Sequence, residues 1–452
     1  MKTHFISIGG SVMHQLAIAL KHKGYFVTGS DDDIFEPSRT NLEKEGLLPA
    51  KMGWDVDNIK PDLDAVILGM HAREDNPELL KAKALGLKIY SFPEYIYQES
   101  KNKIRVAVGG SHGKTTTTSM IMHVLQETGK DFDYLVGAKL EGFKQSVQIT
   151  DAPIIVCEAD EYPASALEKR PKFHFLFPNI AILTGIAWDH INVFPTFEFY
   201  LEQFKIFIDK IEPSGLLIYN EGDETLKQLV ENNKKDDIDY QPYTVPSYSI
   251  SNGITKLTIN GLSQEIKVFG QHNLLNIQAA FYACNKLGVD TKDFLAAISS
   301  FTGAANRLEV LAQTNSCTVF RDFAHAPSKV KATIEAVKSQ FPKRRLIAVL
   351  ELHTYSSLNA AFMPEYKGVL EPADDACVFY SHHAMEIKKM PNLSRDVVSA
   401  GFEKDGLFII TTREALELWL AERNYEKANL LLMSSGNFDG LNLKSVIEKI
   451  EE

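Results

Sequence analysis

Residues 109–118 are of the types and in the order that bind a nucleotide phosphate. They read Gly-Gly-Ser-His-Gly-Lys-Thr-Thr-Thr-Thr and directly follow the apolar run Val106–Val108. A strand, a glycine-rich turn and a helix beginning at Lys114 would direct free backbone N–H groups and the positive helix end toward an anion. Lys114 can then reach the terminal phosphates, and the Thr115 hydroxyl can bind Mg²⁺. Val108 stands where the longer form of this loop has its first glycine, and glycine-rich turns also occur for packing alone.

Two further predicted strands end in side chains that could bind metal or phosphate. The apolar run Ile154–Val156 leads into Cys-Glu-Ala-Asp-Glu, which places Glu158 at a strand end. The run Ile180–Thr184 leads to the pair Asp189 and His190. Ligands of open α/β sheets bind where the parallel strands end, and Mg²⁺ prefers hard oxygen ligands. Glu158 is therefore the best metal-ligand candidate, although a charged loop and a structural histidine are the alternative interpretations.

Three later segments could complete a nucleotide site. His272 and Asn273 open a predicted helix, where they could cap the backbone or bond an adenine edge. Arg307 lies at a predicted domain junction and could clamp a γ-phosphate. Asp322 and His325 directly precede a helix that Pro327 begins.

The elements that must position these residues alternate between strand and helix patterns. The expected strands and helices are at residues 4–8, 12–23, 25–28, 65–68 and 88–90 in the first segment, then at 154–156, 180–184 and 273–287, then at 346–350, 376–380, 407–410 and 430–433. Residues 248–269 read as a hairpin because Asn-Gly pairs interrupt an alternating pattern. The alternation predicts an α/β protein with parallel sheets in three domains, at residues 1–103, 104–310 and 311–452.

Composition excludes several other classes of protein. A chain of 452 residues with 44% hydrophobic residues can fill two or three cores. The net charge of −11 argues against general nucleic-acid binding. Four scattered cysteines indicate no disulfide framework and a reducing cytoplasm. The sequence contains no stretch of about 18 apolar residues, so no membrane span is predicted. The oligomeric state stays open.

Together, these motifs resemble those of one enzyme family. Gly110–Thr115, Glu158–Glu161, Asp189-His190, Gly270–Asn273 with Asn276, Arg307–Glu309 and Asp322–Pro327 occur in the order and spacing of the Mur ligases. The resemblance covers the whole chain. It implies an N-terminal Rossmann-like domain that binds UDP, a central phosphate-loop ATPase domain and a C-terminal Rossmann-like domain. It also implies the chemistry of peptidoglycan synthesis, in which ATP and Mg²⁺ convert a carboxylate of UDP-N-acetylmuramate into an acyl phosphate that an amine attacks.

The resemblance also implies roles for individual residues. The ATP-binding residues would be Gly110, Ser111, His112, Gly113, Lys114, Thr115, Thr116, His272, Asn273, Arg307, Asp322 and His325. The metal ligands would be Thr115, Glu158 and His190, and Lys114, His190 and Arg307 would be catalytic. UDP would be bound by Gly9, Gly10, Ser11, Ser30, Asp31 and His71. The alternative for the acidic run at Asp31 is a solvated loop, since the Gly9-Gly10 turn lacks a full dinucleotide fingerprint.

Two branches of the family match the N-terminal segment, and they differ in the amine that they use. One joins UDP-N-acetylmuramate to the recycled tripeptide L-alanyl-γ-D-glutamyl-meso-diaminopimelate, and the segments 34–42, 169–173 and 432–440 resemble that branch. The other joins it to L-alanine, and Leu352–Tyr355 looks more like this second branch. We expect the tripeptide, with L-alanine as the alternative.

The chain also departs from the family pattern. Asn306 stands where the family has a second arginine, and Ala326 stands where it has a second histidine. Lys205 follows His190 by the distance at which several members carry a carbamylated lysine that bridges to metal, although an ordinary surface lysine is the alternative. A phosphate-loop kinase or ATPase, and a non-catalytic nucleotide binder, are the rival functions.

Overall fold

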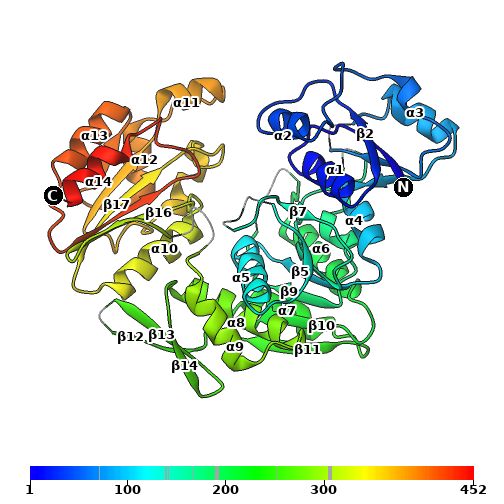
Figure 1. Ribbon diagram of the computed structural model, residues 1–452. Helices are drawn as coiled ribbons and strands as arrows, with labels where there is room; N and C mark the ends of the chain where they lie inside the picture. The colour runs from blue at the N-terminus through cyan, green and yellow to red at the C-terminus, as the bar shows by residue number, and fades with distance from the viewer. Residues whose placement is uncertain are drawn as a thin grey trace. The chain divides into compact units, whose positions relative to one another are not determined.

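The computed structural model describes residues 1–70, 72–137, 140, 142–165, 167–188, 193–251, 253–303 and 308–451. The chain divides into two compact units, Met1–Val245 with Leu275–Ile298, and Pro246–Leu274 with Ser299–Glu452. The predicted α/β class is confirmed, since each unit is built on mainly parallel sheets with helices packed on them (Figure 1).

The first 103 residues form a four-stranded parallel sheet of order β2-β1-β3-β4. In chain order, the strands and helices of this segment are β1 (Lys2–Ile6), α1 (Met13–His22), β2 (Phe26–Ser30), α2 (Ser38–Lys44), η1 (Val56–Asn58), β3 (Ala65–Leu68), α3 (Pro77–Ala84), β4 (Ile89–Ser91) and α4 (Phe92–Ser100). Alternate residues of β1 enter two cores: Phe5 joins the core that contains α1, and Ile6 joins the core that contains Leu79 of α3. The structure ends β1 two residues before the predicted limit, because Ser7 has a φ of 67°.

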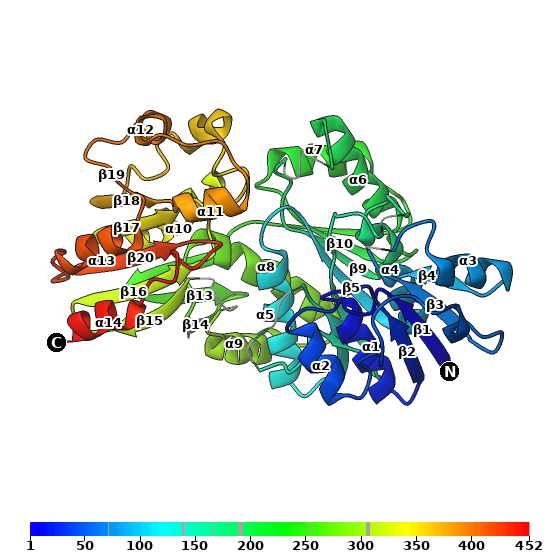
Figure 2. The same ribbon diagram turned by 90° about the horizontal axis from the view of Figure 1, so that it is seen from above.

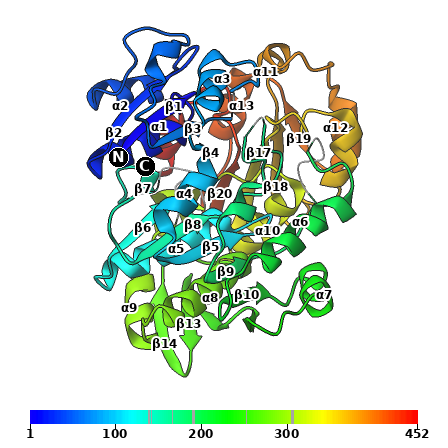
Figure 3. The ribbon, with the colours of Figure 1, turned by 90° about the vertical axis from the view of Figure 1, so that its right-hand side faces the viewer.

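The central sheet has seven strands in the order β11-β10-β9-β5-β8-β6-β7, and β5 lies between β8 and β9 (Figure 3). Its strands are β5 (Ile104–Gly109), β6 (Phe132–Leu135), β7 (Val147–Gln148), β8 (Ile154–Glu158), β9 (Ile180–Leu183), β10 (Leu216–Asn220) and β11 (Asp239–Tyr243). The helices are α5 (Lys114–Glu127), η2 (Lys172–Phe175), α6 (Phe197–Asp209), α7 (Glu224–Asn232), α8 (Gln271–Lys286) and α9 (Thr291–Ser300). Helices α6 and α7 cover one face, and α5 and α8 lie on the other (Figure 2).

The second unit contains two sheets. A three-stranded antiparallel sheet consists of β12 (Ser247–Ser251), β13 (Ile254–Ile259) and β14 (Leu262–Ile266). The predicted hairpin is therefore present, with Asn260 and Gly261 both at positive φ in the turn between β13 and β14.

The larger sheet of this unit has the order β15-β16-β20-β17-β18-β19, in which only β15 is antiparallel to its neighbour. The strands are β15 (Glu309–Gln313), β16 (Cys317–Asp322), β17 (Arg345–Glu351), β18 (Asp375–Phe379), β19 (Phe408–Ile410) and β20 (Ala428–Met433). The helices are α10 (Pro327–Gln340), η3 (Ala360–Tyr366), α11 (His382–Ile387), α12 (Arg395–Phe402), α13 (Arg413–Ala421) and α14 (Leu443–Glu451). One core contains α10, η3 and α12, and the other contains α13 and α14, so the sheet is covered on both faces as predicted.

Candidate nucleotide site

The phosphate loop has the backbone geometry that its glycines predict. Gly110 has a φ of +124° and Gly113 has a φ of +84°, a region that L side chains rarely adopt. A Cβ atom on Gly110 would lie 2.2 Å from Thr184 Oγ1, and one on Gly113 would lie 2.5 Å from Asn276 Oδ1. Helix α5 begins at Lys114 with no side chain capping its N-terminus, so its first N–H groups point toward the loop.

Lys114 is the charged centre of this loop. Its Nζ lies 2.7 Å from the Gly110 carbonyl oxygen and 2.7 Å from Glu161 Oε2. Burial alone would lower the pKa of Lys114, but the nearby carboxylates of Glu161, Asp160 and Glu158 outweigh burial and raise it. The lysine therefore stays positively charged at neutral pH and can attract a phosphate.

Thr115 and Glu158 form the adjoining pair of oxygen groups. The Thr115 hydroxyl donates to Glu158 Oε1 at 2.9 Å, and the Gly137 N–H donates to Oε2 of the same carboxylate at 3.1 Å. A hydroxyl and a carboxylate side by side are hard oxygen donors, which fits a Mg²⁺ ion that keeps several water ligands. Among the described residues, no group of three His, Cys, Asp or Glu side chains gathers as a metal site.

The remaining loop residues face partly into the protein. The Ser111 hydroxyl is hydrogen-bonded to the Ala187 carbonyl at 2.8 Å and to Tyr200 Oη at 2.9 Å, so it anchors the loop to the end of β9. Nδ1 of His112 lies 2.8 Å from the Ser111 carbonyl oxygen, and Thr116 is 8% exposed in the first turn of α5. The Ser111 hydroxyl is therefore engaged within the protein, and anion binding by the loop stays a prediction that rests on its backbone N–H groups.

Asp322 and the residues from 270 to 273 lie in the second compact unit. Asn273 donates to the Phe269 carbonyl oxygen at 2.8 Å, and a Cβ on Gly270 would lie 3.1 Å from the ring of His272. The carboxylate of Asp322, the last residue of β16, accepts from the N–H of Leu308 at 2.7 Å and from that of Ala324 at 2.7 Å, so these two bonds hold it in place. Nδ1 of His325 lies 2.9 Å from the Phe323 carbonyl oxygen.

The predicted UDP residues cluster at the ends of β1 and β2. Asp31 Oδ2 accepts from the Gly9 N–H at 2.6 Å, and a Cβ on Gly9 would lie 2.9 Å from that oxygen. Gly10 is half-buried, Ser11 is exposed, and Ser30 is buried with its hydroxyl donating to Glu78 Oε1 at 2.7 Å. The acidic residue and the glycine turn therefore lie together, and their role in binding UDP stays a prediction.

Four predicted site residues lie outside the described residues, namely His71, Asp189, His190 and Arg307, and so does Asn306, where the chain departs from the family pattern. Their assignments stay predictions. Lys205 is described: it lies on α6 with its side chain 40% exposed and its Nζ 3.8 Å from Glu202 Oε2, one helical turn away.

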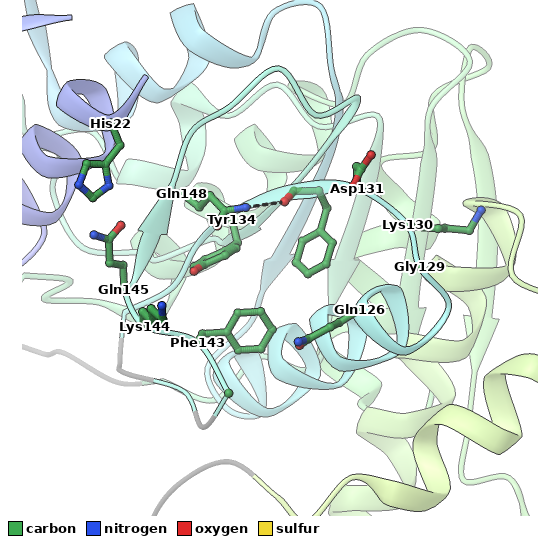
Figure 4. A pocket seen from close by; sticks show the side chains of 12 residues that line it. His22, Gln126, Gly129, Lys130, Asp131, Tyr134, Phe143, Lys144, Gln145 and Gln148 are labelled. Carbon is green, nitrogen blue, oxygen red and sulfur yellow. Dashed lines mark hydrogen bonds between the residues drawn. The ribbon is translucent and has the colours of Figure 1, made fainter. Parts of the chain in front are cut away.

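A pocket of about 710 Å³ lies apart from the phosphate loop (Figure 4). It is lined at the far end of α5 by Gln126 and Gly129, by the β6–β7 region including Phe143, and by His22 of α1. Figure 4 shows His22 and Gln145 facing each other and Lys130 pointing away from the other lining residues. Because α5 begins at the phosphate loop and this pocket lies where α5 ends, it is distinct from the nucleotide site.

Two contacts of the phosphate loop were not anticipated from sequence. Glu161 is 1% exposed and pairs with Lys114, although only Glu158 was singled out in that acidic run. Asn276 reaches Gly113 from α8, one turn after Asn273. The signal that could have indicated Glu161 is its position three residues beyond Glu158, which is the last residue of β8, the strand that pairs with β5.

The fold and the phosphate loop define a nucleotide-dependent α/β enzyme, and comparison with known proteins gives its family. Residues 2–103 match the model "Mur ligase family, catalytic domain", residues 108–284 match "Mur ligase middle domain", and residues 306–436 match "Mur ligase, glutamate ligase domain". A UDP-N-acetylmuramate–L-alanine ligase of Carboxydothermus hydrogenoformans is 30% identical over 461 residues, covering 98% of this chain and 96% of that protein.

One relative of the tripeptide branch and one solved structure of the L-alanine branch also match over nearly the whole chain. A UDP-N-acetylmuramate–L-alanyl-γ-D-glutamyl-meso-2,6-diaminoheptandioate ligase of Haemophilus influenzae is 28% identical over 459 residues, with 99% of each chain covered. The crystal structure of the UDP-N-acetylmuramate–alanine ligase of Thermotoga maritima has the same fold, with a TM-score of 0.66, 23% identity, and 100% of this chain and 98% of that chain covered.

The chain therefore belongs to the Mur ligase family, whose members are ATP-dependent ligases that form amide bonds in peptidoglycan synthesis. The family's three-domain architecture confirms the predicted fold. No helix in the described part of the chain combines the length and hydrophobicity that crossing a membrane requires.

Proposed function

We propose that this ligase joins the lactyl carboxylate of UDP-N-acetylmuramate to the α-amino group of an L-alanyl tripeptide. The observation that carries the proposal is the arrangement of Lys114 and Thr115 at the start of α5 with Glu158 at the end of β8, all within 2.9 Å of their partners. A half-buried cation beside two oxygen ligands suits a Mg²⁺-bound triphosphate, whose charge must be neutralised before an anion attacks it.

In the proposed reaction, a carboxylate oxygen attacks the γ-phosphorus of ATP, and the bond to ADP breaks. The amine nitrogen then attacks the acyl carbon, phosphate leaves with its electron pair, and the nitrogen loses a proton. Lys114 and the N–H groups at the start of α5 hold the phosphate oxygens, and Thr115 and Glu158 would hold Mg²⁺. The bound Mg²⁺ would polarise the γ-phosphate and offset the charge that develops during transfer.

The segment 432–440, which resembles the tripeptide branch, adjoins the end of β17 in the C-terminal sheet. At the end of β17, Glu351 is 2% exposed and accepts from the Phe438 N–H at 2.9 Å and from the Ser434 hydroxyl. Asp439 lies in the same loop, where it accepts from Ser381 at 3.1 Å.

Acidic side chains and histidines lie together at this edge. His353 is the only basic residue in the segments 352–359 and 434–440, and its Nδ1 lies 3.7 Å from Glu351. The exposed Asp439 carboxylate suits the ammonium group that both candidate amines carry. The choice of the tripeptide therefore rests on the resemblance of the segments 34–42, 169–173 and 432–440 to that branch.

The resemblance of Leu352–Tyr355 to the other branch makes L-alanine the second candidate. Purified protein with ATP, Mg²⁺ and UDP-N-acetylmuramate should release phosphate on addition of an amine, with kcat/KM at least tenfold higher for the tripeptide than for L-alanine. The reverse ratio would assign L-alanine instead. Phosphate release that does not depend on the UDP-sugar would indicate a kinase or simple ATPase and would contradict the ligase proposal.

A further inference from the structure

The side chain of Glu78 is fully buried, yet no step of the proposed reaction uses it. It lies in the first turn of α3 and is 0% exposed. Burial alone would raise the pKa of Glu78, but hydrogen bonds from His4, Ser30 and the Asp55 N–H outweigh burial and lower it. A buried carboxylate that stays charged is costly unless its oxygens are fully hydrogen-bonded.

Its partners come from three separate stretches of the N-terminal domain. Oε1 accepts from the Ser30 hydroxyl at 2.7 Å, from the Asp55 N–H at 2.9 Å and from Asn58 Nδ2 at 3.3 Å. Oε2 lies 3.2 Å from His4 Nε2 on β1. One carboxylate thus ties α3 to the ends of β2 and η1 and to the middle of β1.

Backbone hydrogen bonds connect the network around Glu78 to Asp31 on both sides. Ser30 precedes Asp31 in the chain, and the Ser30 carbonyl accepts from the N–H groups of Ser7 and Ile8 at 2.9 and 3.1 Å. On the other side, the Gly53 N–H donates to the Asp31 carbonyl at 2.8 Å, two residues before the peptide that Glu78 binds. The Asp31 carboxylate is thereby aimed at the Gly9 N–H, 2.6 Å away.

We infer that Glu78 is a positioning residue for the nucleotide part of the UDP-sugar: it fixes the end of β2 so that Asp31 and the Gly9 turn are set before the ligand binds. This inference rests on the proposed function, because the UDP-sugar is the ligand that those residues are proposed to meet. Ser30 acts through Glu78, since its buried hydroxyl donates to that carboxylate. Preorganisation of this kind lowers the ordering cost of binding and leaves the chemical step untouched.

The test is calorimetric binding of UDP-N-acetylmuramate to the full-length protein, together with steady-state kinetics. E78Q keeps the shape of the side chain but loses its charge and one acceptor oxygen, so we expect the Kd and KM for the UDP-sugar to rise at least tenfold. The kcat at saturating UDP-sugar and the KM for ATP should stay within twofold. This division between KM and kcat distinguishes positioning from a general loss of folded enzyme.

E94Q is the matched control in the same domain. Glu94 closes the capping box of α4 by accepting from the N–H and the hydroxyl of Ser91, each at 2.7 Å, and it touches neither Ser30 nor Asp31. It should leave the Kd for the UDP-sugar within twofold. An equal rise in both variants would overturn the inference, because any lost carboxylate in this domain would then have the same effect.

S30A keeps the inference testable if E78Q folds poorly. It removes the link between Glu78 and β2 while leaving the carboxylate its other partners, so we expect Kd to rise about threefold or more. If Ser30 acts through Glu78, the double variant E78Q/S30A should bind no more weakly than E78Q. Wild-type affinity in S30A or in E78Q would overturn the inference alone, whereas a wild-type protein that does not bind the UDP-sugar would overturn the proposed function.

Discussion

Replacing Gly110 by alanine tests whether close backbone approach shapes the phosphate loop. A Cβ at this position would lie 2.2 Å from Thr184 Oγ1, 2.9 Å from the Thr184 backbone nitrogen and 3.0 Å from the Gly185 carbonyl oxygen. Two of these three atoms belong to the backbone, so a rotamer change cannot relieve the crowding. The φ of +124° adds strain for any L side chain.

The loss of stability in G110A is estimated from the strain at positive φ and from the crowding of the added methyl group. The unfavourable φ costs roughly 1–2 kcal/mol, and forcing an extra methyl group into a packed site costs about 1–3 kcal/mol. The reduced entropy of the unfolded chain offsets about 0.4–1 kcal/mol of this cost. We therefore expect G110A to lower the free energy of unfolding of the central domain by about 1–5 kcal/mol, with a central value of about 3 kcal/mol, and to weaken ATP binding.

Gly129, just beyond the other end of α5, is the control. Its φ is +67°, but a Cβ there would meet nothing within 4 Å. G129A should therefore cost only about 1 kcal/mol, from backbone strain partly offset by the unfolded chain, and should leave ATP affinity unchanged. The assay is thermal unfolding with and without ATP, where the transition that ATP raises identifies the domain. Equal destabilisation by the two variants would refute the reasoning.

Three further predictions follow from the described contacts. K114M should lower ATP-dependent phosphate release by at least about a hundredfold. It should also destabilise the protein in urea unfolding, because the buried Glu161 carboxylate loses the Lys114 ion pair, and K114M/E161Q should recover stability but not activity. Burial lowers the pKa of His14 and His174 below 6.5 in the folded protein, so below pH 6.5 the unfolded chain binds more protons than the folded chain. The contribution of these histidines to the free energy of unfolding should be complete above pH 6.5 and should fall at lower pH by up to about 1.4 kcal/mol per pH unit for each histidine. Urea titrations should show that glutamine at both positions removes this slope. K205R, which cannot be carbamylated, should keep full ligase activity because Lys205 is an exposed partner of Glu202; a tenfold loss would indicate a metal-bridging role.

The phosphate loop and most strands were predictable because their signals are local. A glycine at positive φ, a lysine and a threonine adjoin one another in the chain, and buried strands read as short apolar runs. The strand Ala65–Leu68 was predicted to the residue. The end of β1 was not, because Ser7 adopts a left-handed conformation that its residue type does not announce.

Contacts between distant segments could not be predicted in the same way. Glu161 meets Lys114 only because β8 pairs with β5, and Asn276 meets Gly113 only because α8 packs beside the loop. The network of Glu78 likewise joins four separate segments, and no spacing in the sequence relates them. The division into compact units also assigns β12–β14 and Gly270–Asn273 to the second unit, which the alternation of apolar runs does not reveal.

The central claim is that the enzyme activates a muramyl carboxylate by phosphorylation, and isotope transfer tests it most directly. UDP-N-acetylmuramate carrying ¹⁸O in both oxygens of its lactyl carboxylate is incubated with the enzyme, ATP, Mg²⁺ and the tripeptide, and the released phosphate is analysed by mass spectrometry. The account predicts one ¹⁸O atom in each phosphate released and one retained in the amide product. Unlabelled phosphate accompanying amide formation would contradict it.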